Sequence, residues 1–177
     1  MENISAIVGE NGLNILINNA GVLPAASRSD SFYTDEMAEC YETNVIAPTK
    51  LTKAILPLLK KAGANDCGGN FTVKHALVVN TSSLVGSIAE VSYGLLLPYR
   101  CSKVALNMVT KSLSCELKKF NIAVISMHPG WVKTDMGTDA APLTKAESMG
   151  VLVQTLMKIT PEHTGHFIAW DGKPIPW

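Results

Sequence analysis

The sequence predicts an α/β fold in which a doubly wound parallel sheet lies between two layers of helices, forming one three-layer αβα domain over residues 1–177. Short apolar runs alternate with longer segments whose apolar residues recur every three or four positions, which is the pattern of strand–helix–strand units. Polar motifs follow three of the runs, as expected at the carboxyl edge of a parallel sheet, where open α/β sheets bind ligands. We therefore expect right-handed crossovers and a ligand site at that edge.

Four apolar runs predict the strands. They are residues 14–17 (NILI), 75–79 (HALVV), 122–127 (IAVISM) and 166–170 (HFIAW). The second and third are nearly continuous in apolar or small residues, as in strands buried on both faces, whereas the fourth is less regular. A polar, glycine-rich segment at residues 65–70 predicts a loop before the second strand.

Apolar stripes between these runs predict the helices. The first two stripes are Leu51, Ile55, Leu58 and Leu59, and then Leu106, Val109, Leu113, Leu117 and Phe120. Pro98 stands just before Tyr99, where the first turn of a helix tolerates proline. Thr144 and Glu147 form a capping box that predicts the start of a last helix. The stripe of that helix is Met149, Leu152, Val153 and Leu156.

The overall composition argues against several classes of function. The formal net charge is zero, so we expect neither nucleic acid nor an anionic membrane as a partner. No apolar run reaches membrane-spanning length, and the first residues lack the basic-then-apolar pattern of a signal peptide. The cysteines have neither zinc-site nor disulfide spacing, so we expect reduced thiols, a cytoplasmic location and no metal site. They are Cys40, Cys67, Cys101 and Cys115.

Tyr99 and Lys103 are four residues apart, so a helix would place both side chains on one face. A free tyrosine titrates near ~10, and a nearby ammonium lowers the pKa of the phenol. The positive end of the helix dipole should act in the same direction. Tyr99 could then donate a proton to a carbonyl oxygen while hydride reaches the carbon. The alternative is a helix-surface pair without a catalytic role, which is the commoner origin of this spacing on its own.

Ser83 follows the second predicted strand and could hydrogen-bond the same carbonyl oxygen. Ser82 is the rival serine, and either hydroxyl could instead satisfy the amides of a turn. Tyr93 is a rival to Tyr99, but the residue four positions after it is Leu97 rather than a lysine.

Five motifs, taken together in this order, resemble those of the short-chain dehydrogenase/reductase family. They are Asn18-Asn19-Ala20-Gly21, Asn44, Asn80-Thr81-Ser82-Ser83, Tyr99-Arg100-Cys101-Ser102-Lys103 and Pro129-Gly130-Trp131-Val132-Lys133-Thr134. The resemblance covers essentially the whole chain and implies a Rossmann-like fold. Residues 129–143 and 165–177 narrow it to the sniffer-type carbonyl reductases and the related C-signal proteins.

The resemblance implies a role for each motif. Tyr99 would be the catalytic acid–base, and Lys103 would lower its pKa and bind the nicotinamide ribose. Ser83 would polarise the carbonyl, and Asn44 would hold a helix kink and a water of the proton relay. Tyr99 and Lys103 would also contact the cofactor. The other cofactor-binding residues would be Asn19, Ala20 and Gly21 on the adenosine side, and Pro129, Gly130, Val132 and Thr134 at the nicotinamide end.

Simpler readings stand beside several of these roles. Asn44 could be an ordinary mid-helix asparagine, and Pro129-Gly130 a simple turn. For His128 we favour a core histidine with satisfied hydrogen bonds over a metal ligand or base, and no spacing supports a metal role for His163. Trp131 and Met136 face the substrate or serve only for packing.

One part of the family pattern is missing from the chain. Family members begin with a strand, a T-G-x-x-x-G-x-G turn and a helix that binds the pyrophosphate. Here the only glycines before the first predicted strand are Gly9 and Gly12. Residues 1–12 resemble the end of the helix that leads into the fourth strand of the family fold. We therefore interpret residues 1–177 as one domain truncated at its N-terminus, without its first βαβαβ half. The strand at residues 14–17 would then be an exposed edge.

Two functions follow from this interpretation. The first is a carbonyl reductase lineage that transfers hydride from NADP(H) to a ketone, aldehyde or quinone, with NAD as the second choice of cofactor. Its partner would be a small carbonyl substrate. The alternative is a non-catalytic truncated isoform or fragment with poor cofactor binding, which acts through protein interaction. Assembly as a homodimer is open in either case.

Overall fold

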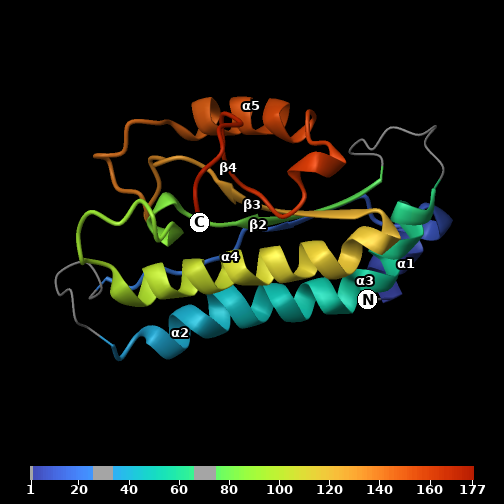
Figure 1. Ribbon diagram of the computed structural model, residues 1–177, viewed down its shortest axis with the longest axis horizontal. Helices are drawn as coiled ribbons and strands as arrows, with labels where there is room; N and C mark the ends of the chain where they lie inside the picture. The colour runs from blue at the N-terminus through green and yellow to red at the C-terminus, as the bar shows by residue number, and fades with distance from the viewer. Residues whose placement is uncertain (1, 26–33, 66–74) are drawn as a thin grey trace.

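The structure is a computed structural model that describes residues 2–25, 34–65 and 75–177 (Figure 1). Four strands form its sheet: β1 (Ile15–Asn18), β2 (Ala76–Thr81), β3 (Ile122–His128) and β4 (Phe167–Ala169). The α-helices are α1 (Glu2–Val8), α2 (Met37–Tyr41), α3 (Ala47–Ala64), α4 (Leu97–Leu117) and α5 (Lys145–Leu156). A π-helical segment, η3 (Glu42–Ile46), joins α2 to α3. The loop predicted at residues 65–70 lies, except for Asn65, outside the described residues, as does Cys67.

The four strands are parallel and follow one another across the sheet in the order β1-β2-β3-β4. All four predicted strands are therefore confirmed. The register places Asn18 beside Asn80, and Asn80 beside Ser126. The residues that follow β1, β2 and β3 consequently emerge at one carboxyl edge, as predicted.

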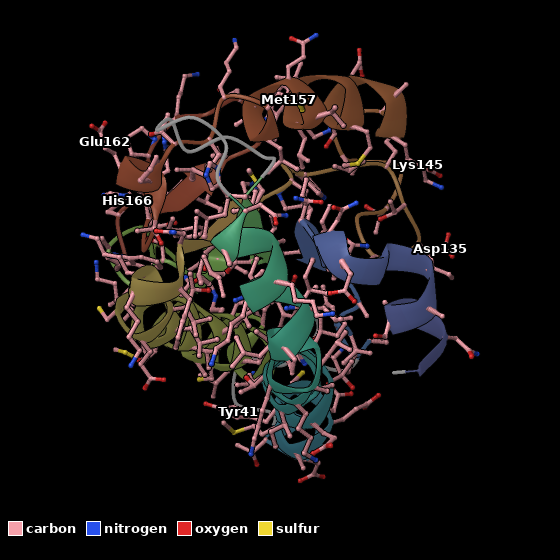
Figure 2. All side chains as sticks on the ribbon, turned by 90° about the vertical axis from the view of Figure 1, so that its right-hand side faces the viewer. Tyr41, Asp135, Lys145, Met157, Glu162 and His166 are labelled. Carbon is pink, nitrogen blue, oxygen red and sulfur yellow. The ribbon has the colours of Figure 1, made fainter. Side chains whose placement is uncertain are left out.

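Two hydrophobic clusters lie on opposite faces of the sheet. On one face, Val78 and Val124 pack with Ile55 and Leu59 of α3 and with the end of α4. On the other face, Val79, Ile125 and Met127 pack against Leu152 and Leu156 of α5. Figure 1 shows α3 and α4 on one side of the sheet and α5 on the other, and Figure 2 shows Lys145 and Met157 near the two ends of α5. The predicted three-layer, Rossmann-like α/β fold is confirmed.

The expectation of uniformly right-handed crossovers is wrong. The strands advance in one direction across the sheet, yet α3 and α4 cross over one face whereas α5 crosses over the other. The third crossover therefore has the opposite hand to the first two, which is rare for parallel strands. The segment between β3 and α5 carries the chain around the carboxyl edge to the second face, where the Ser148 hydroxyl donates to the Pro129 carbonyl oxygen at 2.6 Å.

The predicted helix termini are confirmed, but two of the stripes are less buried than expected. Pro98 lies in the first turn of α4, and Thr144 and Glu147 form the capping box of α5. Leu51 of α3 is 44% exposed, and Met149 and Val153 of α5 are 44% and 56% exposed. Leu152 and Leu156 of α5 pack against the sheet, so this helix buries only part of its predicted stripe.

Strand β1 forms the edge of the sheet in the part of the chain that the structure describes, as predicted. It pairs with β2 alone within the described ranges, and the side chain of Ile17 is 49% exposed. None of the described helices is long and apolar enough to cross a membrane.

Candidate active site

The site begins at the start of α4, which carries Tyr99 in its first turn and Lys103 one turn later. Leu96 precedes the helix in the left-handed region at φ 69°, and Pro98 occupies the first turn. The two side chains are 8% and 3% exposed. The Lys103 ammonium lies 5.4 Å from the centre of the Tyr99 ring and donates to the Thr81 carbonyl oxygen at 2.8 Å. The pair is thus buried at the carboxyl end of β2 and is not a helix-surface pair.

The predicted lowering of the Tyr99 pKa is wrong for this structure. Burial raises the pKa of Tyr99 to about 12, although a hydrogen bond with the Ser83 side chain acts in the lowering direction. Burial also lowers the pKa of Lys103 to about 8. The Lys103 ammonium donates to a backbone carbonyl. Desolvation of the buried phenol therefore raises the pKa of Tyr99 more than a cation at this distance lowers it.

The two rival serines differ in position. Ser83 is partly exposed and reaches the Tyr99 phenol. Ser82 is 2% exposed, and its hydroxyl has no hydrogen-bond partner among the described residues. Tyr93 is also separate from this pair, because its ring lies under the guanidinium of Arg100 at 4.4 Å. The geometry therefore favours Ser83 and Tyr99 over both rivals.

Asn44 lies within the π-helical segment η3, at 1% exposure. Its side-chain oxygen accepts from the Val22 amide at 2.8 Å, and its side-chain nitrogen donates to the Val22 carbonyl at 3.0 Å. The same nitrogen donates to the Ser102 hydroxyl at 3.0 Å. Asn44 is thus not an ordinary mid-helix residue. It ties the segment after β1 to α4, in a widened helical turn of the kind often found at functional sites.

Ser102 is a functional candidate that had no assigned role in the sequence. Its hydroxyl donates to the Tyr99 carbonyl at 2.7 Å while it accepts from Asn44. It therefore connects Asn44 to the helical turn that carries Tyr99. Its position three residues after Tyr99 could have indicated a bond back to that carbonyl, but the sequence could not show that Asn44 approaches it.

The residues after β1 lie beside this cluster. Asn19 accepts a hydrogen bond from the Thr81 hydroxyl at 3.3 Å, whereas Ala20 is exposed. A Cβ atom on Gly21 would lie 3.1 Å from the Asn44 side-chain oxygen and 3.4 Å from the Lys103 ammonium. The missing side chain at Gly21 therefore leaves room next to both polar groups.

The segment after β3 approaches from the other side. Gly130 has φ +85°, and a Cβ atom there would meet Leu143 at 2.6 Å, so this turn requires glycine. Val132 pairs with Leu143, and the Thr134 hydroxyl accepts from the Gly137 amide at 2.9 Å. Met136 reaches the Tyr99 hydroxyl, with its sulfur 4.0 Å away. This loop contains the four predicted residues, Pro129, Gly130, Val132 and Thr134. The contact with Tyr99 is made by Met136.

The expectation of a satisfied core histidine at His128 is wrong in one respect. Its Nδ1 atom is buried without a hydrogen-bond partner among the described residues, and burial lowers its pKa to about 4. By contrast, Nδ1 of His163 accepts from the Thr160 amide at 3.1 Å, which is a structural cap. In the described ranges, no group of three or more His, Cys, Asp or Glu side chains is placed to hold a metal ion.

The glycines before β1 do not form a phosphate-binding turn. Gly12 has φ +75°, and a Cβ atom on it would lie 2.4 Å from the Leu58 carbonyl oxygen of α3. It therefore allows close packing against α3. Within the described residues, the ribose end of a dinucleotide has fitting partners around Gly21 and Lys103, whereas no glycine-rich turn that opens a helix is present for its pyrophosphate.

Comparison with known proteins places these features in one family. The family described as short chain dehydrogenase matches residues 1–144. The curated protein C-signal of Myxococcus xanthus is 34% identical over 93% of this chain and 93% of its own length. The short-chain dehydrogenase srdF of Neurospora crassa is 32% identical over 96% of this chain and 67% of its own length.

Solved structures agree with this assignment. The carbonyl reductase Sniffer of D. melanogaster matches with a TM-score of 0.94 and 42% identity, over 99% of this chain and 71% of that one. An NADPH-bound carbonyl reductase from chicken fatty liver matches with a TM-score of 0.88 and 38% identity, over 99% and 70%. The chain therefore belongs to the short-chain dehydrogenase family of oxidoreductases.

Proposed function

We propose that this chain carries the proton-transfer site of an NADP(H)-dependent carbonyl reductase that acts on a ketone, an aldehyde or a quinone. The observation that carries the proposal is the convergence of Ser83, Tyr99 and Lys103, with Asn44 tied to the same helical turn through Ser102. Relatives described as carbonyl reductases, two of them bound to NADP or NADPH, support the choice of reaction and cofactor.

Each side chain has a distinct role in this mechanism. The raised pKa keeps Tyr99 protonated at neutral pH, which suits the acid that protonates the carbonyl oxygen during reduction. Ser83 hydrogen-bonds the same oxygen and orients it toward the phenol. The Lys103 ammonium, now on the Thr81 carbonyl, is placed to stabilise negative charge that develops on Tyr99.

NADPH, when bound, would supply the hydride. Tyr99 and Lys103 would hold the nicotinamide ribose in the space beside Gly21, and Asn19, Ala20 and Gly21 would line the adenosine side. Pro129, Gly130, Val132 and Thr134 would form the nicotinamide end. The chain covers 71% of the length of the Sniffer structure, and we propose that residues 1–177 belong to one domain. We further propose weak cofactor binding and a cytoplasmic location.

The test is the oxidation of NADPH with quinone and aldehyde substrates by the wild type and by Tyr99→Phe. Loss of the phenolic proton should lower the rate by about 10²–10⁴-fold. Tyr93→Phe is the matched control, because it removes a tyrosine hydroxyl but keeps the half-exposed ring that lies against Arg100, so it should leave the rate unchanged. Equal rates for the wild type and Tyr99→Phe would refute the role of Tyr99.

A second candidate function is a non-catalytic interaction protein that forms a homodimer through β1. The near end-to-end match to C-signal favours it, since that relative aligns over 93% of both chains and its name is not that of an enzyme. The half-exposed Ile17 on an edge strand without charged residues also favours it, because such an edge can pair with a second copy.

Sedimentation velocity together with an NADPH titration distinguishes the two candidates. A homodimer through β1 should dissociate in Ile17→Lys, because a charge blocks pairing at a sheet edge. Ile7→Lys on α1 is the control, since Ile7 is 84% exposed. Tight NADPH binding by a monomeric wild type would exclude the interaction hypothesis.

A further inference from the structure

The loop that connects Ser83 to Tyr99 carries several exposed apolar side chains. They are Leu84, Ile88, Val91, Tyr93 and Leu95, which are between 39% and 66% exposed. The loop lies at the same end of the molecule as the segment after β3 and the start of α4 (Figure 1). That segment brings Met136 to the Tyr99 hydroxyl. The loop ends at Leu96, directly before α4, so an apolar surface lies at the end of the helix that carries the candidate catalytic tyrosine.

Arg100 holds this loop from inside. The residue is 7% exposed, although it carries a guanidinium. Its Nε atom donates to the Leu95 carbonyl oxygen at 2.7 Å, and Nη1 donates to the Val85 carbonyl oxygen at 3.3 Å. The guanidinium also lies 4.4 Å from the centre of the Tyr93 ring. One side chain thus joins both ends of the loop and its exposed aromatic residue.

The contacts of Arg100 indicate positioning rather than ion pairing. No carboxylate pairs with Arg100 among the described residues. A buried cation is unfavourable unless its donors are satisfied, and here two backbone carbonyls and an aromatic face satisfy it. The two bonds come from different nitrogens of the planar guanidinium, whereas lysine carries its three donors on one nitrogen and does not match this spacing.

Backbone strain at the end of the loop also indicates that Arg100 fixes the loop. Leu96 has φ 69°, a left-handed conformation that is unfavourable for a residue with a side chain. Such a conformation persists only where its surroundings fix it. The bond from Arg100 to the Leu95 carbonyl and the bond from the Arg100 amide to the Leu96 carbonyl at 2.8 Å fix the peptides on both sides.

Other contacts anchor the first half of the loop independently. The Ser87 hydroxyl donates to the Pro176 carbonyl at 2.6 Å, and the Ala89 amide donates to the Trp177 carbonyl at 3.1 Å. The Ser82 amide bonds to the Met127 carbonyl at 2.8 Å, which fixes the start of the turn that contains Ser83. Loss of Arg100 should therefore release residues 90–96 while Ser83 stays in place.

We propose that Arg100 is a positioning residue that holds residues 90–96 as an apolar wall beside Tyr99 and so selects bulky, apolar carbonyl compounds. The selection of substrate rests on the proposed reductase function, whereas the positioning of the loop does not. The two parts can therefore be tested separately.

Hydrogen exchange by mass spectrometry tests the positioning on the full chain without cofactor. In Arg100→Gln, the amides of residues 91 and 100, which bond to the Ile88 and Leu96 carbonyl oxygens at 3.4 and 2.8 Å, should exchange about tenfold faster once the loop is released. Arg100→Lys should restore part of the protection, and residues 87–89 and β2 should be unchanged. Lys111→Gln removes a charge elsewhere on α4 and is the matched control. Unchanged exchange at residues 91 and 100, or an equal rise in the strands, overturns the proposal.

A second variant covers the case in which Arg100→Gln does not fold. Tyr93→Leu removes only the half-exposed ring that lies against the guanidinium. It should increase exchange at residues 91 and 100, as Arg100→Lys should, but less than Arg100→Gln would. Unchanged exchange in both Tyr93→Leu and Arg100→Lys overturns the proposal.

Steady-state kinetics with NADPH test the selection of substrate. In Arg100→Lys, KM for a bulky aromatic ketone or quinone should rise about tenfold with kcat nearly unchanged, and both constants for a three-carbon aldehyde should stay within about threefold. An equal loss with both substrates overturns the assignment of an apolar wall. If the wild type shows no activity that depends on Tyr99, the proposed function fails, and hydrogen exchange alone decides whether Arg100 holds the loop.

Discussion

Lys103→Met tests the electrostatics of the site without any cofactor. Lys103 is 3% exposed, and burial lowers its pKa from 10.5 to about 8. The unfolded chain therefore binds this proton more tightly than the folded chain, and the lysine opposes folding most strongly below pH 8. This penalty shrinks as the pH rises through the window from about 8 to 10.5. Between pH 7 and pH 10, the wild type should gain about 2.5 kcal/mol of unfolding free energy from this one group.

Urea denaturation of the wild type and Lys103→Met at pH 7, 8, 9 and 10 measures this effect. Methionine retains most of the apolar stem and cannot titrate, so groups that do not interact with Lys103 cancel in the difference, which leaves Lys103 and its coupling to the Cys40 thiol. Loss of the hydrogen bond to the Thr81 carbonyl changes the difference in unfolding free energy at every pH. Only the slope of this difference against pH reports the pKa of Lys103. The stability of the wild type relative to the variant should rise by about 2–3 kcal/mol from pH 7 to pH 10. A difference that stays constant to within about 0.5 kcal/mol would refute the lowered pKa.

Three further predictions concern the sheet and the site. Ser82→Ala should leave the unfolding free energy in urea denaturation unchanged or raise it, because the buried hydroxyl has no partner among the described residues. By contrast, Ser83→Ala should lower kcat for NADPH oxidation about 10²–10³-fold. Gly63→Ala should lower stability by about 1–3 kcal/mol, because the added Cβ would lie 2.2 Å from the Phe120 carbonyl oxygen, and a melting temperature equal to that of the wild type would contradict this. Asn80→Leu should cost about 1–3 kcal/mol in urea denaturation, because it removes two buried hydrogen bonds, one with Asn18 and one with Thr110.

The Asn80 prediction reflects a polar layer that the sequence did not reveal. The Asn80 side chain accepts from Asn18 at 2.8 Å and donates to the Thr110 hydroxyl at 2.9 Å. Ser126 donates to the same hydroxyl at 2.8 Å. These residues lie at strand and helix positions where the apolar pattern predicts buried, hydrophobic side chains. The pattern does not show which polar residues form hydrogen bonds with one another at such positions. The layer ties the three strands to α4 just behind the candidate active site.

The elements and the order of the motifs could be predicted, because strand length, capping and turn chemistry are local properties. Thr144 and Glu147 began α5 as expected, and the carboxyl ends of β1, β2 and β3 met at one edge. The direction of the Tyr99 pKa could not be predicted from a lysine four residues away. It depends on how deeply the phenol is buried and on the Thr81 carbonyl that accepts from the ammonium, and both arise from contacts distant in the sequence.

The two candidate functions are physically linked at the edge of the sheet. Strand β1 ends at Asn18, and the residues proposed to line the adenosine side of the cofactor, Asn19 to Gly21, follow directly. Asn44 ties Val22, the next residue, to the helical turn of Tyr99. A second copy paired along β1 would therefore change the surroundings of the cofactor site, and linkage requires that cofactor binding change dimerisation by the same factor. We therefore expect the affinity for NADPH and the association at β1 to be coupled.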